Sequence, residues 1–111
     1  MRRELARAGG GIRDRVFTPA EIAYCQSKRY PPRHYAARFA AKEAVLKALR
    51  TGAGEWSCWR EVEVANGPRG EPELILHGGV KRLAGRRRVR RMLVSLSHTA
   101  QVAIASVILE A

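Results

Sequence analysis

The fold of this 111-residue chain is decided by residues 38–54, which read RFAAKEAVLKALRTGAG. Most of this stretch consists of strong helix formers. Phe39 and Leu46 lie seven residues apart, so they share one face of a helix. Gly52 favours a stop, because glycine adopts positive φ at little cost. The pattern predicts a long helix over residues 34–50, which the other elements pack against.

The charges in this helix are unusual for a plain amphipathic segment. Glu43 stands among Arg38, Lys42 and Lys47. The four-residue spacing from Glu43 to Lys47, with the acid first, predicts a helical ion pair. A single carboxylate inside a cationic cluster is also suited to hold a metal ion beside a phosphate group.

Composition limits the classes of function. The chain has 21 basic and 10 acidic residues, a formal net charge of +11. This balance favours an anionic partner, which is nucleic acid, an acidic protein or a phosphate-rich small molecule. No apolar run approaches the roughly 20 residues of a membrane span, and no secretory signal follows the N-terminus. We expect one cytoplasmic domain over residues 1–111, with Cys25 and Cys58 as free thiols.

The N-terminal part predicts two helical segments. Residues 1–8 read as a helical fragment that ends at a run of glycines. Thr18, Pro19 and Glu21 then form a capping-box pattern, which predicts a helix that starts there and ends near Gln26. We expect Glu21 to act only as a capping residue.

The C-terminal half predicts two hairpins separated by a helix. Residues 59–64 and 74–76 are expected to form one hairpin, and residues 92–97 and 102–109 another. A short basic helix is expected over residues 79–88. The last strand carries apolar residues on both faces, which is typical of a strand covered by a helix or a subunit contact. The order of elements predicts an α+β domain with an antiparallel sheet packed on the long helix.

Two further features suggest functional surfaces. Five arginines between residues 86 and 91 form the densest charge run. They fit a solvated surface slightly better than an anion-binding patch, and they leave open a rival function as a basic nucleic-acid-binding module without enzymatic activity. That rival lacks a recognisable reading helix or interleaved aromatic residues. His98 directly follows a strand, where functional residues often lie. His34 and His77 have no evident partner and are expected to be structural.

Three segments together carry a resemblance to a known family. Residues 38–49, followed by Thr51 and Gly52, resemble the signature of the 4′-phosphopantetheinyl transferases, in particular the small holo-(acyl-carrier-protein) synthase branch. Residues 16–22 (VFTPAEI) and 94–99 (VSLSHT) resemble two further family segments, in the same order. The similarity extends over nearly the whole chain.

The resemblance implies a fold, an activity and an assembly. Members of this family transfer the phosphopantetheine arm of coenzyme A to a serine of an acyl carrier protein and release 3′,5′-ADP, with Mg²⁺ bridging the pyrophosphate. The reaction serves fatty acid biosynthesis and lipid metabolism. The small branch forms homotrimers with active sites between subunits. The resemblance therefore implies a magnesium-dependent transferase that has coenzyme A and an acidic carrier protein as partners, and neither a membrane nor nucleic acid.

The resemblance also implies roles for individual residues. Glu43 would bind Mg²⁺, and either Glu43 or a metal-bound water would accept the proton of the serine. Lys47 would contact the phosphates and assist the leaving group. His98 would come from a neighbouring subunit, and Arg13 and Arg15 would dock the acidic carrier. The implied coenzyme A-binding residues are Arg38, Lys42, Lys47, Gly52, His98 and Thr99.

The chain departs from the family pattern at its start. Members begin with a strand of the form Gly-hydrophobic-Gly-hydrophobic-Asp, and its Asp is the second main magnesium ligand. This chain begins inside the following helix, and Asp14 lies too far along to replace that residue. We therefore expect an N-terminally truncated domain that binds Mg²⁺ weakly and is impaired in catalysis.

Overall fold

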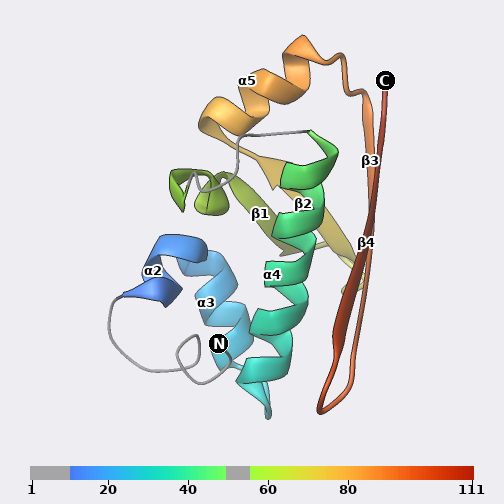
Figure 1. The fold of residues 1–111 in the computed structure, drawn as a ribbon. Helices are drawn as coiled ribbons and strands as arrows, with labels where there is room; N and C mark the ends of the chain where they lie inside the picture. The colour runs from blue at the N-terminus through green and yellow to red at the C-terminus, as the bar shows by residue number, and fades with distance from the viewer. Residues whose placement is uncertain (1–10, 50–55) are drawn as a thin grey trace.

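The computed structural model describes residues 11–49 and 56–111, and the order of elements in these ranges is α+β, as predicted. The helices are α2 (Ile12–Val16), α3 (Pro19–Gln26), α4 (Pro31–Ala48) and α5 (Gly78–Arg86), with a 3₁₀ helix η1 (Trp56–Glu61). The strands are β1 (Val62–Asn66), β2 (Pro72–Leu76), β3 (Arg91–His98) and β4 (Ala103–Glu110). Figure 1 shows α4 as the central element, with α2 and α3 on one side and the β3–β4 hairpin on the other.

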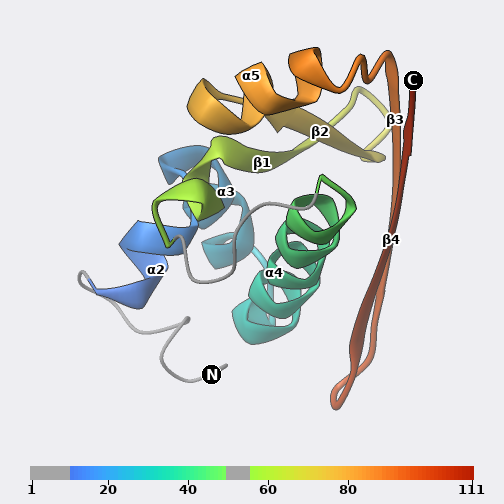
Figure 2. The same ribbon diagram turned by 45° about the horizontal axis from the view of Figure 1, so that its top comes forward.

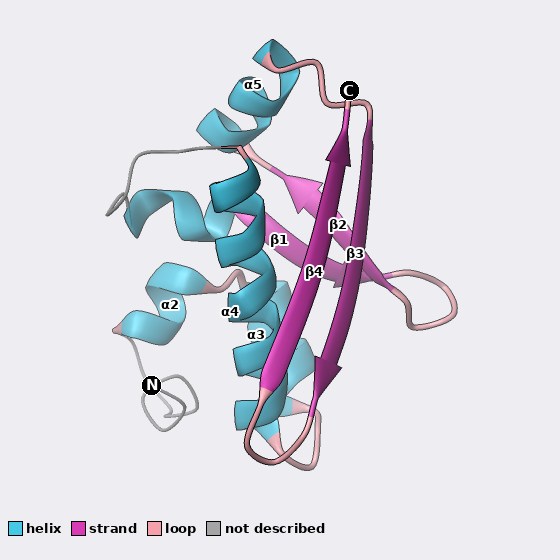
Figure 3. Ribbon diagram, turned by 45° about the vertical axis from the view of Figure 1, so that its right-hand side comes forward, coloured by secondary structure: helices cyan, strands magenta, loops and turns pink. Residues whose placement is uncertain are grey.

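The predicted antiparallel sheet is present as two separate hairpins, one on each of two sides of α4. β1 pairs with β2, with Val62 opposite Leu76. β3 pairs with β4 from Arg91 opposite Glu110 to His98 opposite Ala103. The β3–β4 hairpin runs alongside α4, whereas β1 and β2 cross behind it (Figures 1 and 3). Figure 2 shows α5 lying over the β1–β2 hairpin.

The core consists of two apolar clusters, and α4 contributes to both. One cluster joins the C-terminal half of α4 to β1, β2 and α5, and its buried members are Val45, Leu46, Leu49, Val62, Leu76, Val80 and Ala84. The other joins the N-terminal half of α4 to α2 and α3, and its buried members are Val16, Phe17, Cys25 and Tyr35. Burial of apolar area is the main favourable term in folding, so α4 holds the domain together.

Glu21 connects three elements from inside the protein, and it does much more than cap α3. The predicted capping box with Thr18 is present: the amide of Thr18 donates to Oε1 of Glu21 over 2.9 Å. The expectation that Glu21 only caps is wrong, because its side chain is fully buried and accepts two further hydrogen bonds. Lys42 Nζ donates to Oε1 over 2.8 Å, and the amide of Val64 donates to Oε2 over 2.8 Å.

Lys42 is the buried partner of Glu21, and its side chain has no exposed area. Besides the ion pair with Glu21, its ammonium donates to the carbonyls of Trp59, over 3.1 Å, and Val62. Burial lowers the pKa of Lys42, and the charge of Glu21 opposes that effect. A buried lysine with three interior acceptors is a structural group, since it would have to break these contacts to reach a ligand outside.

The observed elements differ from the prediction mainly at their ends. The strand expected over residues 59–64 begins only at Val62, because the preceding residues form η1. α4 begins at Pro31 rather than His34, since proline suits the first position of a helix. Helix α2 was not predicted, and the helix expected over residues 1–8 lies outside the described residues.

The start of α5 requires glycine at position 78. Gly78 has a φ of 53°, which favours glycine over other residues. A Cβ at Gly78 would also lie within 2.4 Å of the Glu61 carboxylate. That carboxylate accepts a hydrogen bond from the amide of Val80 in the first turn of α5.

Within the described ranges, no helix is both long and apolar enough to cross a membrane.

Candidate functional site

A small pocket brings together two residues that the sequence assigned to the same ligand. It has a volume of about 170 Å³ and lies between α3, α4, the β1–β2 turn and the end of β3. Arg38 comes from α4 and His98 from the last position of β3. The complete lining consists of Tyr24, His34, Ala37, Arg38, Asn66, Gly70, Pro72, Leu96 and His98.

Arg38 is a buried cation that has no acidic partner among the residues that the structure describes. Only 2% of its surface is exposed. Its guanidinium lies 4.0 Å from the centre of the Tyr24 ring and donates from Nη2 to Asn66 Oδ1 over 2.8 Å. Its Nε is buried and has no hydrogen-bond partner. Because an unpaired buried charge is costly, this pocket is suited to receive an anion that pairs with Arg38.

Two histidines line the same pocket in direct contact. The rings of His34 and His98 meet edge to face, with their centroids 4.8 Å apart. Nδ1 of His98 is buried without a hydrogen-bond partner. Burial lowers the pKa of His34, and the nearby His98 and Arg38 lower it further.

The expectation that His34 is only structural overlooked its place in the pocket. His34 and Arg38 are four residues apart on one helix, so they lie on the same face. That spacing was the signal in the sequence that could have placed His34 at the site.

Glu43 and Lys47 belong to a different face of α4. Five residues separate Glu43 from Arg38, which corresponds to about 140° of rotation and about 7.5 Å of rise along an α-helix. Glu43 is half-buried and Lys47 is exposed, and neither lines the pocket. The prediction of an ion pair between Glu43 and Lys47 is wrong, because the structure describes both residues and no ion pair joins them. In the described part of the chain, the Glu43 carboxylate has no hydrogen bond or ion pair.

The other predicted site residues are spread around the molecule. Thr99 follows His98 in the exposed β3–β4 turn, where its hydroxyl accepts hydrogen bonds from the amides of Gln101 and Val102. Lys42 points into the core, as described above, and Gly52 lies outside the described residues.

The two arginines predicted to dock a carrier differ in exposure. The side chain of Arg13 is only 14% exposed, and its Nε lies 3.6 Å from Asp14. Arg15 is exposed on α2. Of the two, Arg15 is therefore better placed to meet a partner.

The basic run of residues 86–91 joins the end of α5 to the start of β3 and lies on the exposed surface of the domain. Its five arginines are all exposed, and they lie away from the Arg38 pocket. Arg91 forms an ion pair of 3.7 Å with Glu110, with both side chains about half exposed or more.

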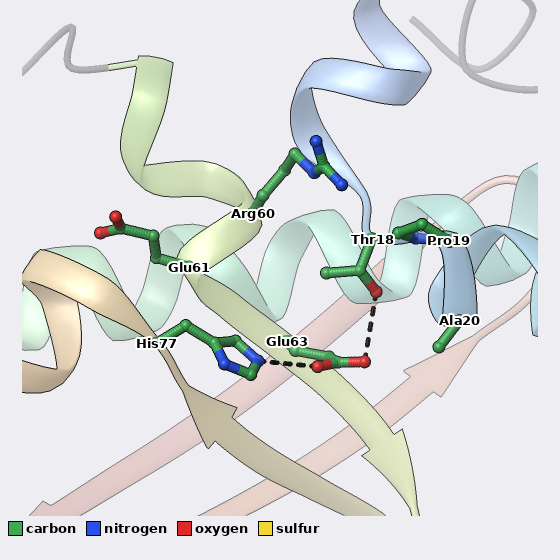
Figure 4. Close-up of a pocket in the computed structure, with 7 residues that line it drawn as sticks. All are labelled: Thr18, Pro19, Ala20, Arg60, Glu61, Glu63 and His77. Carbon is green, nitrogen blue, oxygen red and sulfur yellow. Dashed lines mark hydrogen bonds and ion pairs between the residues drawn. The ribbon is translucent and has the colours of Figure 1, made fainter.

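A second, larger cavity of about 670 Å³ lies on another side of the domain and is shown in Figure 4. Glu63 is its central residue: it contacts His77 Nε2 over 2.8 Å and accepts a hydrogen bond from the Thr18 hydroxyl over 3.2 Å. These contacts tie the start of α3 to β1 and to the residue before α5.

Over the described ranges, no group of three or more His, Cys, Asp or Glu residues is arranged to hold a metal ion.

Comparison with known proteins defines the class to which this chain belongs. Residues 1–105 match the model of the 4′-phosphopantetheinyl transferase superfamily, so the chain is a member of that family. It is 44% identical to a holo-(acyl-carrier-protein) synthase of Geobacter sp. (strain M21) over 106 residues, which cover 96% of this chain and 85% of the relative. It is 50% identical to that of Desulforudis audaxviator, over 89% of this chain and 75% of the relative.

Solved structures agree with this assignment. The holo-(acyl-carrier-protein) synthase of Helicobacter pylori in complex with coenzyme A matches with a TM-score of 0.73 and 30% identity, over 87% of this chain and 79% of that one. The enzyme of Neisseria meningitidis matches with a TM-score of 0.82 and 27% identity, over 98% and 87%. That of Bacillus anthracis, in complex with coenzyme A (3′,5′-ADP), matches with a TM-score of 0.68 and 32% identity, over 86% and 76%.

Proposed function

We propose that this chain is a holo-(acyl-carrier-protein) synthase of the cytoplasm, which transfers the 4′-phosphopantetheine group of coenzyme A to a serine of an acyl carrier protein. Its family and the activity of its relatives support this assignment. The observation in the structure that supports it best is the pocket of Arg38 and His98. In the described part of the chain, the Arg38 guanidinium has no acidic partner and the neighbouring imidazole nitrogen has no hydrogen bond, and such a pair of groups fits a phosphate.

Coenzyme A carries a reacting pyrophosphate and a separate phosphate on its ribose, and the pocket suits the second. The pyrophosphate must lie beside Glu43 and Lys47 if these residues act on it. Arg38 lies on another face of α4, with His98 of β3 beside it, so we assign these two residues to a phosphate that does not react. Thr99, next to His98, is placed at the edge of the same ligand.

Glu43 fits the role of a magnesium ligand. Mg²⁺ is commonly held by one or two carboxylates together with substrate phosphates and water. The Glu43 carboxylate is half-buried and has no partner among the residues that the structure describes, so it is free to accept a cation. Bound Mg²⁺ would stabilise negative charge on the phosphate oxygens.

Lys47 lies one turn after Glu43, and its exposed ammonium is free to contact the pyrophosphate. In the transfer, the serine oxygen forms a bond to phosphorus while the bond between phosphorus and the leaving oxygen breaks, and 3′,5′-ADP departs. The serine proton passes to a base, for which Glu43 is the candidate on this chain. Lys47 compensates the charge that develops on the leaving oxygen.

The site is shared between subunits of a homotrimer in this proposal. One coenzyme A cannot easily contact two faces of the same helix, but it can lie between the Arg38 pocket of one subunit and Glu43 of another. The outer face of the β3–β4 hairpin supports an assembly, because it exposes Leu93, Ile104 and Ile108 to water in the single chain. His98 would thus be supplied by the neighbour of the subunit that supplies Glu43.

The carrier protein is an acidic partner in this proposal. The net charge of +11 would speed its approach by electrostatic steering. Arg15, with a smaller part from Arg13, is the proposed docking position because it is exposed on α2.

The direct test is transfer of labelled phosphopantetheine from coenzyme A to an apo-carrier protein in the presence of Mg²⁺. We expect one group per carrier, attached to a serine. Glu43→Gln should lower kcat/KM by about 100-fold or more, since it removes the charge that holds the metal. The control Glu110→Gln changes an exposed acid outside the site and should leave kcat/KM unchanged. Failure of the unaltered chain to transfer any label would contradict the proposal.

A further inference from the structure

We propose that His34 takes up a proton when the ribose phosphate of coenzyme A enters the Arg38 pocket, and so becomes a second cationic contact for that phosphate beside Arg38. This inference rests on the proposed function. It adds a ligand-binding residue that the sequence had assigned to structure alone, and it makes the affinity for coenzyme A depend on pH.

The position of His34 supports a role toward the ligand. Its ring lines the pocket between Tyr24, at a centroid distance of 5.9 Å, and His98, at 4.8 Å. No hydrogen bond holds the imidazole nitrogens of His34 in the described part of the structure, so they remain free for a bound anion. A cavity of about 170 Å³ leaves little distance between a phosphate inside it and the surrounding rings.

The charges around His34 explain why it stays neutral while the pocket is empty. Four basic residues lower its pKa, in addition to the larger effect of burial: Lys28 from the turn after α3, Arg33 and Arg38 from α4, and His98 from β3. Tyr24 and Asn66 supply the other polar side chains of the lining. A proton on His34 in the empty pocket would add a charge beside Arg38, with no anion to balance it.

A phosphate monoester reverses this balance. It brings up to two negative charges into the pocket, which pair with Arg38 and attract a proton to His34. An opposite charge at this range typically raises a histidine pKa by about 1–3 units. Binding is then coupled to proton uptake, so affinity rises as the pH falls, by at most about tenfold per pH unit between the free and bound pKa values of His34.

The test is an NMR titration of the chain with ring-labelled histidine, with and without saturating 3′,5′-ADP. We expect the pKa of His34 to rise by about one unit or more when 3′,5′-ADP is bound. The matched ligand is 5′-AMP, which is 3′,5′-ADP without the ribose 3′-phosphate, and it should leave this pKa unchanged. A rise of equal size with both ligands would overturn the inference.

A variant supplies the second measurement. His34→Gln keeps a polar side chain of similar size but does not titrate. The affinity for 3′,5′-ADP is measured at pH 6 and at pH 8 in both proteins, and the ratio of the two affinities is compared. This ratio should be larger for the unaltered chain than for His34→Gln. The phosphate of the ligand ionises in the same way in both experiments, so the difference reports on His34. Bound 3′,5′-ADP with an unchanged His34 pKa overturns this inference alone. If 3′,5′-ADP does not bind at all, the proposed function falls, and the inference falls with it.

Discussion

Glu21 and Lys42 form an ion pair with no exposed side-chain area on either partner, and it links α3, α4 and β1. Removing one member of such a pair leaves an uncompensated buried charge. We predict that Glu21→Gln lowers the free energy of unfolding by about 3–5 kcal/mol, measured by urea denaturation.

The exposed pair Arg91 and Glu110 is the matched control for this prediction. Glu110→Gln should cost less than about 1 kcal/mol, because solvent screens an exposed ion pair. Equal losses in the two variants would show that burial of Glu21 does not matter. The double variant Glu21→Gln/Lys42→Met should lose less than the sum of the single changes, since it leaves no unpaired charge.

Cys25 is a second residue with a testable chemical state. Burial raises the pKa of its thiol from 9.0 to about 12, and the nearby Arg38 opposes the shift. Because only the thiolate is reactive, we predict that iodoacetamide modifies Cys25 very slowly in the native protein at pH 8 and readily in urea. Peptide mass spectrometry would separate this signal from that of Cys58. Fast labelling of native Cys25 would show that its surroundings are open to solvent.

The sequence predicted only some of the contacts that these side chains make, and the reason is physical. The capping box of Glu21 was predictable because it depends on a local spacing of three residues. The ion pair with Lys42 was not, because it joins residues 21 positions apart whose approach depends on how the helices pack. The ion pair of Glu43 with Lys47 satisfied the spacing rule but does not form, since exposed helical pairs gain only about 0.2–0.5 kcal/mol.

The start of α3 is held by a hydroxyl with two roles. The Thr18 hydroxyl accepts a hydrogen bond from the amide of Glu21 over 3.2 Å and donates one to Glu63 (Figure 4). We predict that Thr18→Ala lowers the free energy of unfolding by about 1 kcal/mol, whereas Thr18→Ser costs much less. Thermal or urea unfolding would show the difference. Identical losses in both variants would mean that the methyl group, and not the hydroxyl, stabilises this end.

The sequence predicted most of the helices and strands, but not the boundaries at which one element passes into the next. The sequence predicted α4 from its run of strong helix formers and the β3–β4 hairpin from two strands joined by a short connection. It also predicted that both faces of the last strand are covered, whereas within the single chain only one face of β4, with Val107 and Leu109, packs on the core, and Ile104 and Ile108 are exposed. The sequence predicted that the first strand begins at Trp59, whereas residues 59–61 belong to the 3₁₀ helix η1 and the strand begins at Val62. The carbonyl of Trp59 in η1 accepts a hydrogen bond from Lys42 of α4, a contact between residues 17 positions apart that no local pattern encodes.

The outer face of the β3–β4 hairpin determines the assembly in the proposed trimer. Ile104 is 62% exposed in the single chain, so a charge there should leave the fold intact but disrupt a contact between copies. We predict that Ile104→Asp changes a trimer into monomers in sedimentation equilibrium. Ile12→Asp, at an exposed apolar residue on α2, is the control and should remain trimeric. A monomeric unaltered chain at micromolar concentration would contradict the trimer.

The central claim is that one active site combines Arg38 of one subunit with Glu43 of another, because these residues lie on different faces of α4. Subunit mixing tests it most directly. Arg38→Met and Glu43→Gln should each be nearly inactive in phosphopantetheine transfer. When equal amounts are refolded together, about three quarters of the trimers are mixed, each with one intact site of three, so we predict recovery of about a quarter of the unaltered activity. Mixed trimers without any recovered activity would contradict the shared site.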